Sequence, residues 1–286
     1  MTEREIMKYI DLFAGSGGLS LGLYNAGLHG IFAVERNKDA FSTLKYNLID
    51  GRNHFSWPNW LEMKNWDINE LLEIHRKELA ELKGSVDLVV GGPPCQGFSM
   101  AGKRKNNDGR NQLMHSYIEF IKLVQPTMLF FENVQGFTVG FKDHKDKQNY
   151  SDILVSELHE LGYNLDYKIV TMSEYGVPQN RKRFILFASK NETSEVFFDE
   201  LMKNKDCFLK DRGLKIPITI SQAINDLKKS HGEVDSKDTK AFKNGKYGRA
   251  TSAYQKLMRN NIERGAFPDS HRFAKHKSET IDLFKR

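Results

Sequence analysis

The chain of 286 residues is 39% hydrophobic, so it can bury a full core as one large domain or as one domain with a smaller attachment. No apolar run approaches the roughly 20 residues of a bilayer helix, and residues 1–5 do not begin a signal peptide. The two cysteines form no disulfide framework. These features favour a cytoplasmic globular protein. The formal charge of +6 is unevenly distributed along the sequence, because residues 240–286 hold twelve Lys and Arg against four Asp and Glu. This concentration of cations favours polyanionic partners or, with equal weight, a solvated charged face.

A strand, a glycine-rich loop and a helix are predicted at the start of the chain. The strand covers residues 7–13, glycines follow at positions 15, 17 and 18, and a helical pattern runs through Ala26. Such a loop lets backbone N–H groups approach a ligand, although it has neither of the usual phosphate-loop spacings. A second predicted strand, residues 31–34, ends in Glu35, where an acid can bind ribose hydroxyls. Together these features indicate a ligand of the adenosine type.

A third strand is predicted to end at Asp67. A helix is expected over residues 39–48, and the chain then leads through residues 57–67 to the pair Asp67-Ile68. At a strand end, Asp67 could accept from an adenine amino group while Ile68 packs on the ring. With equal weight, Asp67 could cap the helix predicted over residues 70–82.

A single cysteine follows the next predicted strand. Residues 86–90 form a short apolar run typical of a buried parallel strand, and the motif GGPPCQGFS follows it. The two glycines allow unusual dihedrals and the two prolines stiffen the loop, so Cys95 is held just past a strand end, where open α/β sheets bind ligands. The alternative is an inert buried cysteine on a proline turn, but the whole motif favours a catalytic thiol.

A second strand end brings a carboxylate toward this cysteine. After a polar, basic loop over residues 100–110, a helix is predicted over residues 113–124 and a strand over residues 128–131, ending in Glu132. A helix of this length between two strands is the usual βαβ crossover, so Cys95 and Glu132 are expected to share a pocket.

The remaining predicted elements lead to a basic cluster. They are a helix over residues 150–161, a strand over residues 167–171 and a strand over residues 184–188. The cluster at residues 178–183 precedes the last strand, and it either supplies cations to a site or protects the edge of the sheet.

In this order, the motifs resemble those of the DNA cytosine-5 methyltransferases, which use S-adenosylmethionine and often belong to restriction–modification systems. The resemblance covers about residues 8–190: DLFAGSGG is similar to the first cofactor motif, GGPPCQGFS to the nucleophile loop, Glu132-Asn133-Val134 to the ENV motif and QNRKR to the Q-x-R-x-R motif. It implies an α/β fold, a doubly wound and mostly parallel seven-stranded sheet with helices on both faces and an antiparallel last strand. Residues 1–190 would form the catalytic and cofactor-binding domain, and residues 191–286 a connector and partial small domain.

The resemblance also implies the residues that contact S-adenosylmethionine; no metal is expected. Glu35 would bind the ribose and Asp67 the adenine. The full set is Phe13, Ala14, Gly15, Ser16, Gly18, Leu19, Glu35, Arg36, Asp67, Ile68, Pro94 and Leu113.

The chemistry of the reaction accounts for the catalytic residue types. Cytosine C5 is a weak nucleophile, so the Cys95 thiolate would first add at C6 and place electron density on C5. Glu132 would assist at N3, Arg183 would hold the cytosine O2 and orient Glu132, and Arg181 would build the pocket or bind phosphate. The target cytosine of double-stranded DNA must be flipped out to reach such a pocket, with residues 100–110 as the lid.

Residues after 190 depart from the family's pattern. The sequence contains no Gly-Asn dipeptide, which the family's last motif has, and residues 191–286 are too few for a target-reading domain. We therefore expect a split or truncated enzyme, with a second polypeptide that carries the target-recognition region. The alternatives are a catalytically silent DNA-binding or regulatory fragment and a tRNA cytosine-5 methyltransferase. Residues of the basic end that could contact phosphate are Arg249, Lys256, Arg259, Arg272 and Lys275.

Overall fold

The computed structural model describes residues 6–94, 110–138, 149–191, 194–236, 239–260, 262–263 and 265–285. The chain forms two compact units. The sheet unit comprises Met1–Val170 and Lys182–Lys203, and the C-terminal unit comprises Thr171–Arg181 and Asn204–Arg286. The division into domains at residue 190 stays a prediction.

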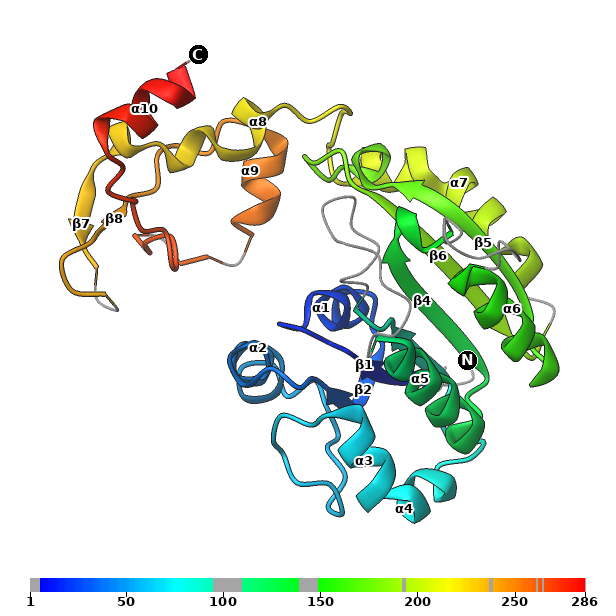
Figure 1. Cartoon of the computed structure of the whole chain (residues 1–286). Helices are drawn as coiled ribbons and strands as arrows, with labels where there is room; N and C mark the ends of the chain where they lie inside the picture. Colours follow the sequence, from blue (N-terminus) through cyan, green and yellow to red (C-terminus); the bar gives the residue numbers. More distant parts are fainter. Residues whose placement is uncertain are drawn as a thin grey trace. The chain divides into compact units, whose positions relative to one another are not determined.

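The sheet unit is built on a sheet whose six described strands lie in the order β2-β1-β3-β4-β6-β5 (Figure 1). The neighbours β2, β1, β3 and β4 pair in parallel, whereas β6 runs antiparallel to β4. This confirms the predicted α/β class with a mostly parallel sheet and an antiparallel last strand. The strands are β1 (Lys8–Leu12), β2 (His29–Val34), β3 (Leu88–Gly91), β4 (Met128–Val134), β5 (Asn164–Thr171) and β6 (Lys182–Ser189).

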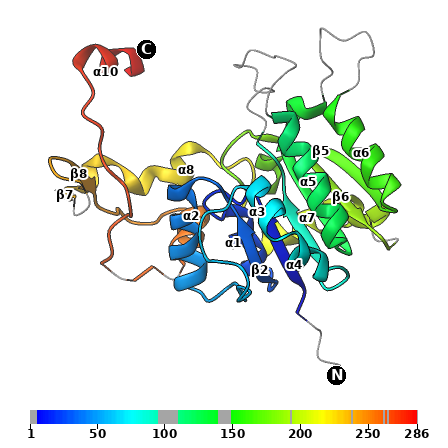
Figure 2. The same cartoon turned by 60° about the horizontal axis from the view of Figure 1, so that its bottom comes forward.

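Helices cover both faces of this sheet (Figure 1, Figure 2). Side chains alternate along each strand, as the pleat requires, so that in β1 Ile10 and Leu12 enter one buried cluster and Tyr9 enters the other. The first cluster includes side chains of α3 to α6, and the second includes side chains of α1, α2 and η1. The helices are α1 (Gly18–Asn25), α2 (Lys38–Leu44) with its π-helical continuation η1 (Lys45–Asp50), α3 (Ile68–Ile74), α4 (Arg76–Glu81), α5 (Arg110–Val124), the 3-10 turn η2 (Gln135–Thr138), α6 (Tyr150–Glu160) and α7 (Ser194–Asp211).

The predicted strand ending at Asp67 is wrong, and it accounts for the difference between seven expected and six described strands. The chain touches the sheet edge beyond β2 at one parallel bridge, between Gly30 and Phe55. Pro58 then lacks the N–H that a strand would need, and the indoles of Trp57 and Trp66 donate to the carbonyls of Leu61 and Glu62. The two indoles thus bond, within four residues, to backbone carbonyl groups that a strand would instead pair with β2.

The helix predicted over residues 70–82 is two helices. The break falls at His75, whose ring packs at 5.3 Å from both Trp60 and Trp66. The backbone of His75 leaves the helical region, with φ −113° and ψ 28°, and this ends α3 before α4 begins.

The C-terminal unit contains short elements around one buried ion pair. Asp226, which is 4% exposed, pairs with Arg259, and the Arg259 guanidinium also lies 4.0 Å from the centre of the Tyr247 ring. In the described part of the chain, no helix is both long and apolar enough to cross a membrane. The elements are η3 (Met172–Tyr175), α8 (Ile220–Ile224), η4 (Asn225–Leu227), η5 (Lys229–His231), the antiparallel pair β7 (Glu233–Asp235) and β8 (Lys243–Gly245), α9 (Ala253–Met258) and α10 (Ser278–Lys285).

Candidate active site

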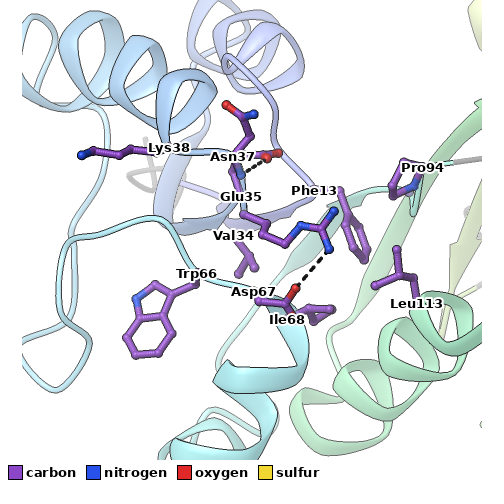
Figure 3. Close-up of a pocket in the computed structure, with 12 residues that line it drawn as sticks. Phe13, Val34, Glu35, Asn37, Lys38, Trp66, Asp67, Ile68, Pro94 and Leu113 are labelled. Atoms are coloured by element: carbon purple, nitrogen blue, oxygen red, sulfur yellow. Dashed lines mark hydrogen bonds and ion pairs between the residues drawn. The ribbon is translucent and has the colours of Figure 1, made fainter. Parts of the chain in front are cut away.

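A cavity of about 560 Å³ lies where β1, β2 and β3 end (Figure 3). Its volume falls in the range of about 300–1,000 Å³ that is typical of sites for cofactors and other small molecules. The carboxyl ends of parallel strands are the usual place for such a site. The cavity is lined by Phe13, Val34, Glu35, Arg36, Asn37, Lys38, Trp66, Asp67, Ile68, Gly92, Pro94 and Leu113.

The loop after β1 has a constrained backbone that faces this cavity. Phe13 has a positive φ of 59°, which is uncommon for a residue with a side chain, and it is held there while its ring lines the cavity. Gly17 has φ 85°, and a Cβ at this position would lie 2.8 Å from Leu48 Cδ1. Only glycine therefore lets the loop pass this closely over η1 before α1 begins.

Glu35 joins the end of β2 to the glycine loop. One carboxylate oxygen accepts from the backbone N–H of Gly15 at 2.9 Å, and the other accepts from that of Asn37 at 2.6 Å. A carboxylate offers about four lone-pair sites, so acceptor capacity is left for hydroxyl groups of a ligand. Glu35 thus has a structural role in the loop in addition to its place in the cavity wall.

Asp67 is both a helix cap and a residue of the cavity. Its Oδ1 accepts from the backbone N–H of Asn69 at 2.9 Å, which caps α3 as the second sequence interpretation proposed. Its Oδ2 lies 3.7 Å from Nη1 of Arg36, which also lines the cavity. The Arg36 side chain is 76% exposed, so the pair adds little to stability.

Close backbone contacts explain the two glycines at the end of β3, Gly91 and Gly92. A Cβ at Gly91 would lie 1.9 Å from the carbonyl oxygen of Leu12, and one at Gly92 would lie 2.2 Å from that of Glu132. The chain leaves the sheet between β1 and β4 with no space for a side chain. In addition, the buried amide of Asn133 donates to the carbonyl oxygen of Pro93 at 3.1 Å. The start of the motif is therefore fixed to β4; Cys95, like every residue from 95 to 109, lies outside the described residues.

A carboxylate and a guanidinium pair across the antiparallel strands β4 and β6. Arg183 stands opposite Val134, and its Nε lies 2.5 Å from Glu132 Oε1. The Arg183 side chain is 13% exposed and that of Glu132 is 40% exposed, so the guanidinium is largely enclosed while the carboxylate reaches solvent. This close ion pair restrains the orientation of the carboxylate.

Sequence profiles identify the family. The profile of the C-5 cytosine-specific DNA methylases matches residues 7–283. The chain belongs to this family. The match continues well past residue 190, where we expected the resemblance to thin.

Individual relatives are Type II methyltransferases. The chain is 35% identical to M.XorII of Xanthomonas oryzae over 187 residues, which cover 63% of this chain and 40% of that relative. It is 31% identical to M.HindV of Haemophilus influenzae over 222 residues, which cover 77% of this chain and 64% of that relative. The chain thus spans less than half the length of M.XorII.

Solved structures show the same architecture. A crystal structure described as a DNA modification methyltransferase encoded within an E. coli prophage is similar, with 27% identity and a TM-score of 0.57 over 88% of this chain and 64% of that one. The Dnmt2 methyltransferase of S. pombe, 23% identical with a TM-score of 0.52 over 70% of this chain and 56% of that one, shares the fold.

The residues expected from the cytosine-5 methylase motifs fall into groups. Seven of the twelve cofactor residues line the cavity: Phe13, Glu35, Arg36, Asp67, Ile68, Pro94 and Leu113. The other five do not line it: Ala14 and Leu19 pack on the second core cluster, Gly15 donates to Glu35, Ser16 is exposed in the loop, and Gly18 is exposed at the start of α1.

Of the residues expected to be catalytic that lie in the described part of the chain, Glu132 and Arg183 are paired. Arg181 belongs to the C-terminal unit and is exposed, with its backbone bonded to Gln179 and Met172.

Sequence reasoning missed five residues of the cavity wall. They are Val34, Asn37, Lys38, Trp66 and Gly92. All of them lie within three residues of a predicted strand end or of a predicted contact, so proximity to Glu35, Asp67 and Pro94 was the signal that could have found them.

Proposed function

We propose that this chain is the catalytic part of a DNA cytosine-5 methyltransferase of a restriction–modification system. It would transfer a methyl group from S-adenosylmethionine to C5 of a cytosine flipped out of double-stranded DNA. The observation that carries the proposal is the position of Gly92, which lines the cavity and packs directly against the backbone of Glu132. The cavity and the Glu132–Arg183 pair therefore share one edge, as a methyl donor and a base-binding carboxylate must.

The cavity suits an adenosyl group. Phe13, Ile68 and Leu113 offer apolar surface to a purine, Glu35 retains acceptor capacity for a ribose diol, and Asp67 can accept from an amino group. S-adenosylmethionine supplies an electrophilic methyl group when it is bound. The residues of the cavity would hold and orient it.

The chain's own residues would activate the cytosine. The Cys95 thiolate forms a bond to C6, and the electron pair of the C5–C6 double bond moves toward C5. The Glu132 carboxyl group, oriented by Arg183, would bind N3 and stabilise the charge that develops on the ring. C5 then takes the methyl group, the C5 proton is lost, and the C6–S bond breaks as the thiolate departs.

The test is a methyl-transfer assay with labelled S-adenosylmethionine on duplex DNA and on tRNA, with and without the product of the neighbouring reading frame and with Cys95→Ala as the control. Transfer to duplex DNA that requires Cys95 is the expected result. Transfer to tRNA alone would favour the RNA alternative, and S-adenosylmethionine binding without transfer to either substrate would favour a silent fragment. The identities of 31–35% to M.HindV and M.XorII favour DNA.

The proposal includes a second polypeptide with a target-reading segment. Its test compares methylation at a defined sequence by the chain alone and by the chain mixed with the product of the neighbouring reading frame. A cytoplasmic location also stays a prediction.

A further inference from the structure

Hydrogen bonds connect the Asp67 carboxylate of the cavity to a buried serine on helix α5. Asp67 Oδ1 accepts from the backbone N–H of Asn69 and from its side-chain Nδ2, both at 2.9 Å. Asn69 Oδ1 in turn accepts from Ser116 Oγ at 2.5 Å. Ser116 is 5% exposed, so this chain of bonds runs from the cavity wall into the protein interior.

The charge of Asp67 fixes the direction of this chain of bonds. An ionised carboxylate only accepts, so Asn69 must turn its amide NH₂ toward Asp67 and its carbonyl oxygen toward Ser116. Ser116 Oγ also lies 2.8 Å from the carbonyl oxygen of Gln112. Because that carbonyl accepts the helical N–H of Ser116, the single hydroxyl proton is best used on Asn69. Each donor thus points toward the anion, and such ordered chains strengthen one another.

The result is that one oxygen of Asp67 is held and the other is presented to the cavity. Oδ1 is occupied by the two bonds from Asn69, whereas Oδ2 faces Arg36 at 3.7 Å, beyond hydrogen-bond distance. A fixed acceptor oxygen binds an N–H donor and repels a carbonyl oxygen. A purine with an amino group at C6 satisfies Oδ2, and a purine with an oxo group at C6 does not.

We propose that Asn69 and Ser116 are positioning residues that set the preference of the cavity for a 6-amino purine over a 6-oxo purine. They act through Asp67 and would not touch the ligand. Ser116 follows Leu113 by three residues, so one face of α5 carries both the apolar contact of the cavity wall and the last donor of the chain of bonds. The inference rests on the proposed function, since it assumes that the cavity binds an adenosyl group.

The experiment measures, by calorimetry on the full chain, the affinities for S-adenosylhomocysteine and S-inosylhomocysteine. The variants are Ser116→Ala, Asn69→Ala and Ser116→Thr, which keeps a hydroxyl group. A matched control is Ser151→Ala, because Ser151 is a buried serine that donates to an asparagine, Asn149, at the same distance of 2.5 Å but at the start of α6. Thermal denaturation of each variant reports on folding.

The expected result is a loss of roughly 3- to 10-fold in affinity for the adenosyl ligand in Ser116→Ala and Asn69→Ala, with the affinity for the inosyl ligand changed by less than about twofold. Ser116→Thr and Ser151→Ala should keep the wild-type ratio of the two affinities. An equal loss for both ligands, or an unchanged ratio, would overturn the inference. A wild-type chain that binds neither ligand would instead overturn the proposed cofactor site, and the inference with it.

Discussion

Glu35 holds the glycine loop and is also the residue proposed to bind the ribose. Because both of its oxygens accept backbone N–H groups, of Gly15 and Asn37, removing the carboxylate would change the loop as well as the proposed contact with a ribose. We expect Glu35→Ala to weaken S-adenosylhomocysteine binding roughly 10- to 150-fold, the equivalent of one or two charge-assisted hydrogen bonds. Calorimetry measures this directly.

A control separates lost contact from lost stability. Asn149→Ala removes the cap of α6, which accepts from Asp152, and should lower the melting temperature without changing ligand affinity. If Glu35→Ala bound the ligand as tightly as the wild type, Glu35 would not belong to the site.

Asp11 makes the stability of the sheet unit depend on pH. Burial raises the pKa of Asp11 to about 7, and the negative charge of Glu35 raises it further, although the hydroxyl of Ser20 donates to it at 2.5 Å and opposes the shift. In the unfolded chain an aspartate has a pKa of about 4. The folded protein therefore keeps a proton that the unfolded chain has lost, so the contribution of Asp11 to stability is fully present below about pH 4 and is lost as pH rises through about 7.

The change Asp11→Asn should remove this contribution. We expect the variant to lose less thermal stability than the wild type between about pH 5 and about pH 8. Melting temperatures across this range measure the effect, and parallel profiles for the two proteins would show that Asp11 is not the responsible group.

At the scale of elements, the register of β4 against β6 places Arg183 beside Glu132. We expect Arg183→Ala to lower the single-turnover rate of methyl transfer roughly 10- to 150-fold, the equivalent of losing a close interaction between two charged groups. Arg183→Lys should recover little of it, because an ammonium does not reproduce the geometry of the guanidinium. Lys168→Ala, which removes the exposed pair with Asp199 at 3.8 Å, is the control and should leave the rate unchanged. A full rate in Arg183→Ala would show that the pair is structural.

The elements also show what the sequence could and could not predict. The strands β1 to β4 were predictable because each contains a short apolar run close to a glycine or an acid. The strand expected to end at Asp67 does not form, since indole N–H groups bond to nearby backbone carbonyls and Pro58 lacks an N–H, and hydrophobic periodicity does not reveal these local effects. Helix α7 was also not predicted.

The candidate site was predictable where a residue belongs to a motif and unpredictable where it depends on packing. Glu35 and Asp67 follow from their places in the motifs, and both line the cavity. The bond from Ser116 to Asn69 joins residues 47 positions apart, and no local pattern marks it.

At the scale of the whole molecule, positive charge is concentrated in the C-terminal unit. From Asn204 to Arg286 the sequence has nineteen Lys and Arg against ten Asp and Glu. Arg259, suggested by the sequence as a phosphate contact, is instead engaged with Asp226 and Tyr247. Arg249, Lys256 and Lys275 are exposed.

Replacing these three exposed cations by glutamine should reduce the salt dependence of duplex binding. Each phosphate contact contributes about 0.9 to the magnitude of the slope when the logarithm of the association constant is plotted against the logarithm of the salt concentration. Loss of three contacts should therefore reduce that magnitude by up to about 2.7. Fluorescence anisotropy at several salt concentrations measures it. Lys77→Gln with Lys83→Gln, two exposed changes in the sheet unit, should leave the slope unchanged. An unaltered slope in the triple variant would place the DNA elsewhere.

The most direct test of the central claim is covalent trapping. Duplex DNA with 5-fluorocytosine at the target position cannot complete the final elimination, so the enzyme stays attached after methyl transfer. The chain would be incubated with this DNA and S-adenosylmethionine, alone and with the product of the neighbouring reading frame, and the adduct mapped by mass spectrometry. We predict a methylated adduct on the peptide that contains Cys95, and none with Cys95→Ser. An adduct on the exposed Cys207, or one formed by Cys95→Ser, would contradict the proposed mechanism.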